Sequence, residues 1–323
     1  MSIVYKTTIT PDFVFLNWDL NGTVTLGDTT KNINEIVAEV AGEIKAKWDP
    51  DLSEMSFKDY IQKHAVTGDK YDHGIKEKQE AEIGNLLGRL KDLAKLSEEN
   101  LKLYQKASEL YEKLAKRYLN PEKQRATLAP YPSVKVLIDK MQAMCLTTVT
   151  LRTFGGDGPL VAEEFSKSGI PMTRKATFTE DGMQIEGEDF VRKGTDLLRS
   201  LQEMNTIGRD QFQRWKDNDR KAGSGKRIYC VKDAKFEGKT VLSIFFDDNL
   251  KKRKKDSEIK PADPQEQNIA FPVDIAGKET SWDDRGVIGI RVNPIKAALQ
   301  DDYFVIKVNK QLIKRGFAPL PLS

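Results

Sequence analysis

The chain has 323 residues, a length that allows one or two domains. Its 52 basic and 49 acidic residues nearly cancel, leaving a formal net charge of +3 that predicts neither a nucleic-acid nor a membrane surface. Even the basic run at 251–255 is followed at once by acidic residues, so we expect no nucleic-acid partner. No run approaches the roughly 20 apolar residues of a transmembrane segment, and the first residues lack the apolar core of a signal peptide. We expect a cytoplasmic globular protein, with export that needs no N-terminal signal left open.

The first element in chain order is a buried strand that ends in polar residues. Phe13 to Trp18 are aromatic or aliphatic with one exception and carry no charge, which predicts a strand buried on both faces. Asp19 follows directly, and Gly22 allows a tight turn beside it. Because ligands of open α/β sheets bind at the carboxyl ends of the strands, Asp19 is a candidate site residue.

A long and mostly helical segment comes next. Apolar residues recur at helical spacing from Ile33 to Ile44, from Ile83 to Leu93 and from Leu101 to Tyr118. These stripes predict amphipathic helices that pack against one another. We therefore expect residues 31–133 to form a separate helical domain, inserted into a core domain made of residues 1–30 and 134–323.

Strand patterns then alternate with helical ones. Cys145 to Leu151 is rich in β-branched residues and leads to Thr153, while Thr240 to Phe246 is apolar and leads to an Asp-Asp pair. Between them, Lys226 opens a shorter apolar run after a glycine-containing loop. Alternating strands and helices predict an α/β fold, with a Rossmann-like parallel sheet and helices on both of its faces.

The polar residues at these positions occur in an order known from one protein family. Asp19-Leu-Asn21-Gly-Thr after a buried strand resembles motif I of the haloacid dehalogenase (HAD) superfamily, and Thr153, Lys226 and Asp247-Asp248 follow in the order of its other motifs. The run from Phe245 to Asn249 is similar to motif IV of the magnesium-dependent phosphatases in that family. The resemblance covers residues 13–25 and about 145–249. It leaves two alternatives open, which are Thr150 for motif II and Lys232 for motif III.

The resemblance implies a phosphatase that hydrolyses a phosphomonoester through an aspartyl-phosphate intermediate and depends on Mg²⁺. Asp19 would be the nucleophile and also a metal ligand, together with the main-chain carbonyl of Asn21 and the side chain of Asp248. Thr153 would bind a phosphoryl oxygen, and Lys226 would neutralise charge on the reacting groups. Asp247 would hold Lys226 in place. The helical segment would be a cap over the site, and the substrate a phosphorylated small molecule or a phosphotyrosine-like group.

Asn21 is the departure from the family pattern, which has Asp there as general acid and base. An amide cannot carry a proton to a leaving group, and such help typically contributes about 10²–10⁴-fold. We therefore expect activity on aryl phosphates, whose leaving groups need less help, and little on alkyl phosphates. Two alternatives stay open: a protein phosphotyrosine phosphatase, and a catalytically weakened HAD-like binding module.

Overall fold

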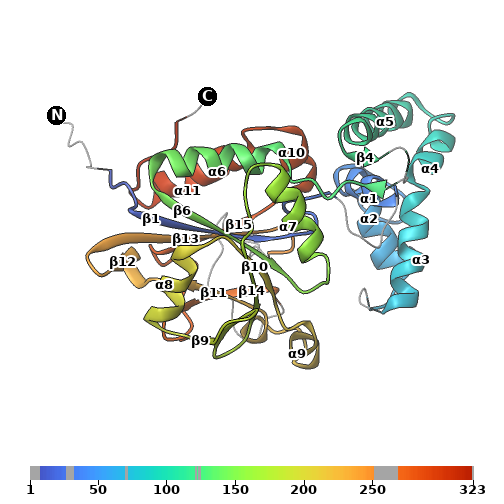
Figure 1. Ribbon diagram of the computed structural model, residues 1–323. Coiled ribbons are helices and arrows are strands. Elements are labelled where there is room, and N and C mark those ends of the chain that lie inside the picture. The colour runs from blue at the N-terminus through green and yellow to red at the C-terminus, as the bar shows by residue number, and fades with distance from the viewer. Residues whose placement is uncertain are drawn as a thin grey trace. The chain divides into compact units, whose positions relative to one another are not determined.

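The computed structural model describes residues 8–26, 33–69, 72–120, 122, 125–250 and 268–321 (Figure 1). The chain divides into two compact units, one of residues 1–25 with 129–323 and one of residues 26–128. The second unit corresponds to the segment for which the sequence predicted a helical domain at 31–133. The first seven residues and the basic run at 251–255 lie outside the described residues. Within the described ranges, no helix is long and apolar enough to cross a membrane.

The first unit is mixed α/β and is built on a nine-stranded, mostly parallel sheet. The strands of this sheet are β1 (Phe13–Asp19), β6 (Leu146–Thr153), β7 (Arg174–Phe178), β8 (Gly182–Ile185), β9 (Phe190–Arg192), β10 (Thr206–Arg209), β12 (Lys235–Phe236), β13 (Lys239–Asp247) and β15 (Val287–Arg291). Parallel pairs join them in the order β15–β13–β1–β6–β10–β7. Strands β12, β8 and β9 add antiparallel pairs at the two sides.

Strand β1 lies between β13 and β6, and this central place explains its composition. Phe13 pairs with Val241 on one side and with Leu146 on the other. The side chains from Phe13 to Trp18 are all buried, as the apolar run predicted. The parallel register brings the carboxyl ends of the three strands to one edge of the sheet.

Helices cover both faces of the sheet, as the alternating pattern predicted (Figure 1). Those of this unit are α6 (Pro132–Met144), α7 (Gly158–Lys167), α8 (Thr195–Glu203), α9 (Phe212–Asp217), α10 (Pro294–Leu299) and α11 (Tyr303–Lys314), with short 3₁₀ turns at Ala222–Ser224 and Lys232–Ala234. Helices α6, α10 and α11 pack together on one face, and α8 lies on the other.

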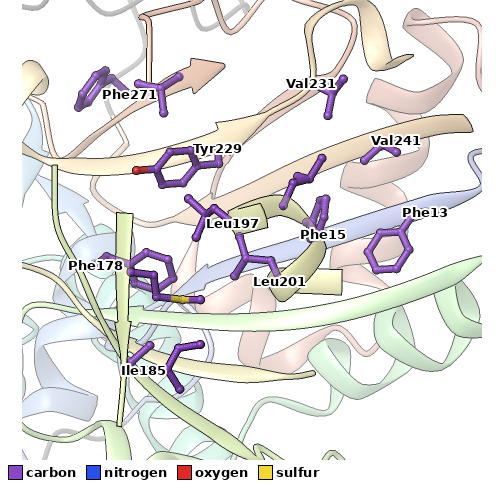
Figure 2. Packing of buried hydrophobic residues seen from close by; sticks show 14 of the residues in the cluster. Phe13, Phe15, Phe178, Ile185, Leu197, Leu201, Tyr229, Val231, Val241 and Phe271 are labelled. Atoms are coloured by element: carbon purple, nitrogen blue, oxygen red, sulfur yellow. The ribbon is translucent and has the colours of Figure 1, made fainter. Parts of the chain in front are cut away.

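A separate two-stranded sheet packs below the main one. Strand β11 (Lys226–Cys230) pairs in parallel with β14 (Ala270–Asp274) and has no strand pairing with the nine-stranded sheet in the described part of the chain. One apolar cluster joins the two layers: Figure 2 shows Leu197 and Leu201 of α8 beside Phe15 of β1 and Tyr229 of β11. Because Lys226 begins β11, it approaches the main sheet from this second layer.

The second unit is mostly helical. Its helices are α1 (Asn34–Glu43), α2 (Phe57–Tyr60), a π-helical turn at Ile61–Ala65, α3 (His73–Gly84), α4 (Leu86–Leu93) and α5 (Glu98–Tyr118), with short strand pairs β2 (Lys45–Ala46) with β3 (Met55–Ser56) and β4 (Leu119–Asn120) with β5 (Arg125–Ala126). The predicted apolar stripes form its core, in which Val40, Leu86 and Leu114 are fully buried. Ser97 caps α5 by accepting a hydrogen bond from the Asn100 amide at 3.2 Å.

Candidate active site

Three acidic side chains gather where β1 and β13 end. Asp19 is the last residue of β1, and Asp247 is the last residue of β13, followed by Asp248. Carboxylate oxygens of these three residues lie within 4.8 Å of one another. In the part of the chain that the structure describes, this is the one group of acidic, histidine or cysteine side chains spaced to hold a metal ion.

Lys226 is the cation of this cluster. Its Nζ atom forms an ion pair with Asp19 Oδ1 and lies 3.6 Å from Asp247 Oδ2, and its side chain is 0% exposed. Burial alone would lower the pKa of Lys226, but the charges of Asp19, Asp247 and Asp210 raise it above its ordinary value. The residue is therefore a charged ammonium. The alternative, Lys232, lies in an exposed 3₁₀ turn after β11, so the structure brings Lys226 to the acidic residues.

Asp247 is fully buried and only partly satisfied. Its Oδ1 atom accepts a hydrogen bond from the Asn249 amide at 2.7 Å, whereas Oδ2 has no hydrogen-bond partner among the described residues. Burial and the nearby charge of Asp19 raise the pKa of Asp247 well above its usual range, although Lys226 acts to lower it. Asp247 therefore lies close to Lys226 and also belongs to the carboxylate group itself.

The turn after β1 holds Asp248. Thr23 Oγ1 accepts a hydrogen bond from the Asp248 amide at 3.0 Å and lies 3.3 Å from its Oδ1 atom, to which it donates. Gly22 has φ +74°, and a β-carbon there would lie 3.0 Å from Asp248 Oδ2. The backbone conformation therefore favours glycine, and a side chain at this position would crowd the Asp248 carboxylate.

Thr153 ends β6 at the same edge of the sheet. It is buried, and its Oγ1 atom accepts a hydrogen bond from the Gly155 amide at 2.9 Å. An accepted bond leaves the hydroxyl proton able to point toward another acceptor, such as a phosphoryl oxygen. The alternative, Thr150, lies inside β6, where it is paired with Asn17 of β1 and Thr206 of β10. The structure therefore places Thr153, and not Thr150, at the strand end.

Asn21 contacts a residue that the sequence reasoning missed. Its Nδ2 atom donates a hydrogen bond to Asp157 Oδ2 at 3.2 Å, and its Oδ1 atom is buried with no hydrogen-bond partner in the described ranges. Asp157 directly precedes α7 and is 8% exposed. The one signal in the sequence was its place in the Gly155-Gly156-Asp157 loop that follows β6.

A second buried ion pair, also missed, lies beside the cluster. Arg152 is 1% exposed; its Nε atom donates to Asp210 Oδ2 at 3.0 Å, and a second nitrogen bonds Asp210 Oδ1. Its remaining nitrogen donates to the main-chain oxygen of Arg227 at 3.0 Å, and the guanidinium lies 3.6 Å from the centroid of the Phe178 ring. This pair ties β11, which carries Lys226, to β6.

The donor set suits a hard divalent cation. Mg²⁺ prefers oxygen ligands, with one or two carboxylates from the protein. The cluster supplies carboxylates from Asp19, Asp247 and Asp248, and one buried oxygen of Asp247 makes no hydrogen bond among the described residues. Lys226 balances a single one of these three negative charges. The residues therefore fit the ion that the resemblance implies.

Comparison of the chain with protein-family models, with curated proteins and with solved structures found no match.

Proposed function

We propose that this protein is a Mg²⁺-dependent phosphatase with a Rossmann-like core of the HAD type, hydrolysing a phosphomonoester through an aspartyl-phosphate intermediate. The observation that carries the proposal is the position of Asp19. It ends the central strand, pairs with the buried ammonium of Lys226, and lies within 4.8 Å of the carboxylates of Asp247 and Asp248. The polar residues of the four predicted motifs are separated along the chain and gather at one end of the sheet.

Charge explains why a metal is part of this proposal. Three carboxylates and one ammonium leave the cluster with excess negative charge, which would repel a phosphate ester. When bound by Asp19, Asp248 and the main-chain carbonyl of Asn21, Mg²⁺ would offset that repulsion and polarise the phosphoryl group.

The chain's own residues would carry out the chemistry in two steps. An oxygen of Asp19 attacks the phosphorus atom, and the bond from phosphorus to the ester oxygen breaks. Water then attacks the phosphorus of the aspartyl phosphate, which releases phosphate and restores Asp19. Lys226 offsets the charge on Asp19 and the transferring group, and the hydroxyl group of Thr153 donates to a phosphoryl oxygen. Asp247 holds the ammonium group of Lys226 in position.

The helical unit of residues 26–128 has a role in the same proposal. As a cap, it would exclude water from the reacting groups and select the leaving group. A cap of this size favours a small phosphorylated molecule, whereas a phosphotyrosine on a protein would need a more open site. The two substrate classes can be separated by comparing a free phosphate monoester with a phosphotyrosine peptide.

A second candidate function is a binding module that holds a phosphorylated ligand without turning it over. Asn21 favours this candidate, because it occupies the acid–base position of the family and its amide has no proton that it can transfer to a leaving group. Both candidates predict binding of Mg²⁺ and of a phosphate mimic such as vanadate. Only the phosphatase predicts turnover and a phosphorylated protein.

The test is phosphate release from 4-nitrophenyl phosphate with Mg²⁺ and with excess EDTA, together with the intact mass of rapidly quenched protein. We expect turnover that EDTA abolishes and Mg²⁺ restores, and a fraction of protein heavier by one phosphoryl group. Binding of Mg²⁺ and vanadate without turnover would favour the binding module. Turnover that is equal in EDTA would overturn the metal-dependent mechanism.

A further inference from the structure

A cavity of the α/β unit is lined by residues that the proposed reaction does not use. It has an empty volume of about 290 Å³, is open to solvent, and has Arg152, Glu180, Asp210, Arg214 and Arg227 in its lining. We propose that Arg214 and Arg227 form a binding site for a small oxyanion, a phosphate or a carboxylate group, and that the Glu180 carboxylate occupies this site in the structure.

The charges in the lining of this cavity do not balance. Among the described residues that line it, three guanidinium groups meet two carboxylates. Both oxygens of Asp210 accept hydrogen bonds from Arg152, so this pair is complete by itself. The Glu180 carboxylate is therefore shared by two arginines, Arg214 and Arg227, and an excess of one positive charge remains.

Glu180 bridges the two arginines as a bound oxyanion would. Its Oε1 atom accepts a hydrogen bond from Arg227 Nη2 at 3.0 Å, and its Oε2 atom accepts one from Arg214 Nη2. Burial alone would raise the pKa of Glu180, but the charges of Arg227 and Arg214 hold it below its ordinary value. The carboxylate is thus charged, and it lies between two planar guanidinium groups, the side chains best suited to bind phosphate and carboxylate groups.

Arg227 is enclosed by the fold, whereas Glu180 is not. The Arg227 side chain is 13% exposed, and its guanidinium lies over the ring of Phe271, 5.6 Å from the ring centroid. Glu180 lies in the turn between β7 and β8, and its side chain is 48% exposed. Because an exposed ion pair contributes little to stability, an oxyanion from solution can replace the Glu180 carboxylate while Arg227 stays in position.

This site is separate from the acidic cluster, although Lys226 and Arg227 are consecutive in β11. Successive side chains of a strand point to opposite faces. Tyr229, on the face of Arg227, belongs to the apolar cluster of Figure 2, and Ile228, on the face of Lys226, belongs to a different one. The oxyanion at Arg227 is therefore not the phosphoryl group that Asp19 would attack. It is a free anion or a second anionic group of the substrate, and only the second source rests on the proposed phosphatase function.

The first experiment is isothermal titration calorimetry of the full chain with inorganic phosphate in EDTA. Without a metal, the negative charge of the acidic cluster repels phosphate, so binding reports on the arginines. Glu180→Gln should bind phosphate at least about 5-fold more tightly than the parent, the fold-change to which a strong exposed ion pair converts. Adding Arg214→Gln to that variant should weaken binding by at least about 10-fold, because a charged hydrogen-bond donor is lost.

Glu237→Gln is the matched control. Glu237 pairs at 2.6 Å with Arg199, and its replacement changes the net charge by the same amount as Glu180→Gln. We expect it to bind phosphate as the parent does. An equal gain in Glu237→Gln would overturn the inference, and so would binding that survives Arg214→Gln, or no binding by either the parent or Glu180→Gln. If Glu180→Gln does not fold, the parent and Arg214→Gln decide: binding that is absent from the parent or equal in the two overturns the inference.

A second experiment separates the two sources of the oxyanion. It measures KM for 4-carboxyphenyl phosphate and for 4-nitrophenyl phosphate, with Mg²⁺, in the parent and in Arg214→Gln. If the oxyanion is a group of the substrate, the variant should raise KM about 10-fold more for the carboxyphenyl ester than for the nitrophenyl ester. An equal effect on both esters, with phosphate binding that depends on Arg214, assigns the site to a free anion. A parent that hydrolyses neither ester removes the proposed function, whereas phosphate binding in EDTA still decides the inference.

Discussion

Two buried cations lie at the same end of the sheet, and their surroundings differ. Arg152 makes two hydrogen bonds to Asp210 and one to the main-chain oxygen of Arg227. Lys226 is hydrogen-bonded to Asp19, lies 3.6 Å from Asp247, and faces an oxygen of Asp247 that accepts no hydrogen bond from the described residues. Both carboxylate oxygens of Asp210 accept hydrogen bonds from Arg152, whereas one buried carboxylate oxygen beside Lys226 accepts none from the described residues.

If the proposed function holds, the difference separates a structural ion pair from a reactive one. A buried charge that is fully paired and hydrogen-bonded rigidifies its surroundings, whereas a partly satisfied cluster costs stability. Such a cost is expected where a ligand or metal completes the arrangement, and violations of local rules concentrate at functional sites. At the same edge of the sheet, the Arg152–Asp210 pair thus supports β11, and β11 supplies Lys226 to the acidic cluster.

The largest expected effect comes from breaking the Lys226 cluster at Asp19, the proposed nucleophile. Asp19→Asn should lower turnover of any phosphate ester by at least about 10⁴-fold while leaving the fold intact, because an amide is a poor nucleophile. The measurement is kcat/KM for 4-nitrophenyl phosphate, with circular dichroism to check the fold. Asp12→Asn is the control, since Asp12 precedes the other end of β1 and its side chain accepts from the Thr240 amide. Unchanged hydrolysis by Asp19→Asn would remove the mechanism.

Breaking the structural pair should instead appear in stability. Arg152→Met leaves the Asp210 carboxylate buried without its partner, and we expect a loss of about 3–5 kcal/mol in the free energy of unfolding. Replacing both residues, Arg152→Met with Asp210→Leu, should recover much of that loss because no uncompensated charge remains. Urea unfolding of both variants measures the difference. A loss below about 1 kcal/mol in the single variant would mean that the Arg152–Asp210 pair is not a structural ion pair on which the stability of the fold depends.

Metal binding sharpens the comparison, because only the open cluster should respond to Mg²⁺. Asp248→Ala removes one of the three carboxylates and should weaken Mg²⁺ binding by at least about 10-fold, the loss typical of even an outer partner of a metal. Isothermal titration calorimetry with Mg²⁺ measures it. The control is Asp189→Ala, at an exposed position. Equal Mg²⁺ affinity in Asp248→Ala and the parent would show that Asp248 is not a ligand.

The sequence predicted what local composition determines. The apolar run before Asp19 predicts β1, and the polar residues after β1, β6 and β13 predict where a site would form, because parallel strand ends share an edge. It could not predict the partner of Asn21, which lies 136 residues away, or the partner of Arg152, 58 residues away. Such contacts depend on how loops and layers pack. The second layer formed by β11 and β14 was missed for the same reason.

The unit boundaries show the same limit on a smaller scale. The sequence placed the helical segment at 31–133, and the structure gives 26–128. Helical stripes mark where helices lie, but the residues that connect two units belong to whichever unit they contact. Residues 129–131, which directly precede α6, fall in the α/β unit. No periodic pattern distinguishes these three residues from the helical segment before them.

The smallest effect that we predict has the opposite sign to that of Arg152. Burial and Asp19 raise the pKa of Asp247, so this carboxyl group binds its proton more tightly in the folded chain than in the unfolded one. Its contribution to stability is then full below the unfolded pKa of about 3.9 and is lost as the pH rises through the folded pKa. Asp247→Asn mimics the protonated group and keeps an oxygen for the Asn249 amide. In EDTA, we expect it to be more stable than the parent at neutral pH, with the difference vanishing below about pH 4.

Urea unfolding at both pH values, in metal-free buffer, measures this effect, and Asp210→Asn is the comparison. Asp210 accepts two hydrogen bonds from Arg152, so its replacement should destabilise the chain at neutral pH. Opposite signs for the two variants would establish that one buried acid is held for structure and the other at a cost. If Asp247→Asn also destabilises the metal-free protein at neutral pH, the charge of Asp247 is stabilised as fully as that of Asp210. The cluster around Lys226 would then be a second structural ion pair, and the physical ground for placing the reaction there would be lost.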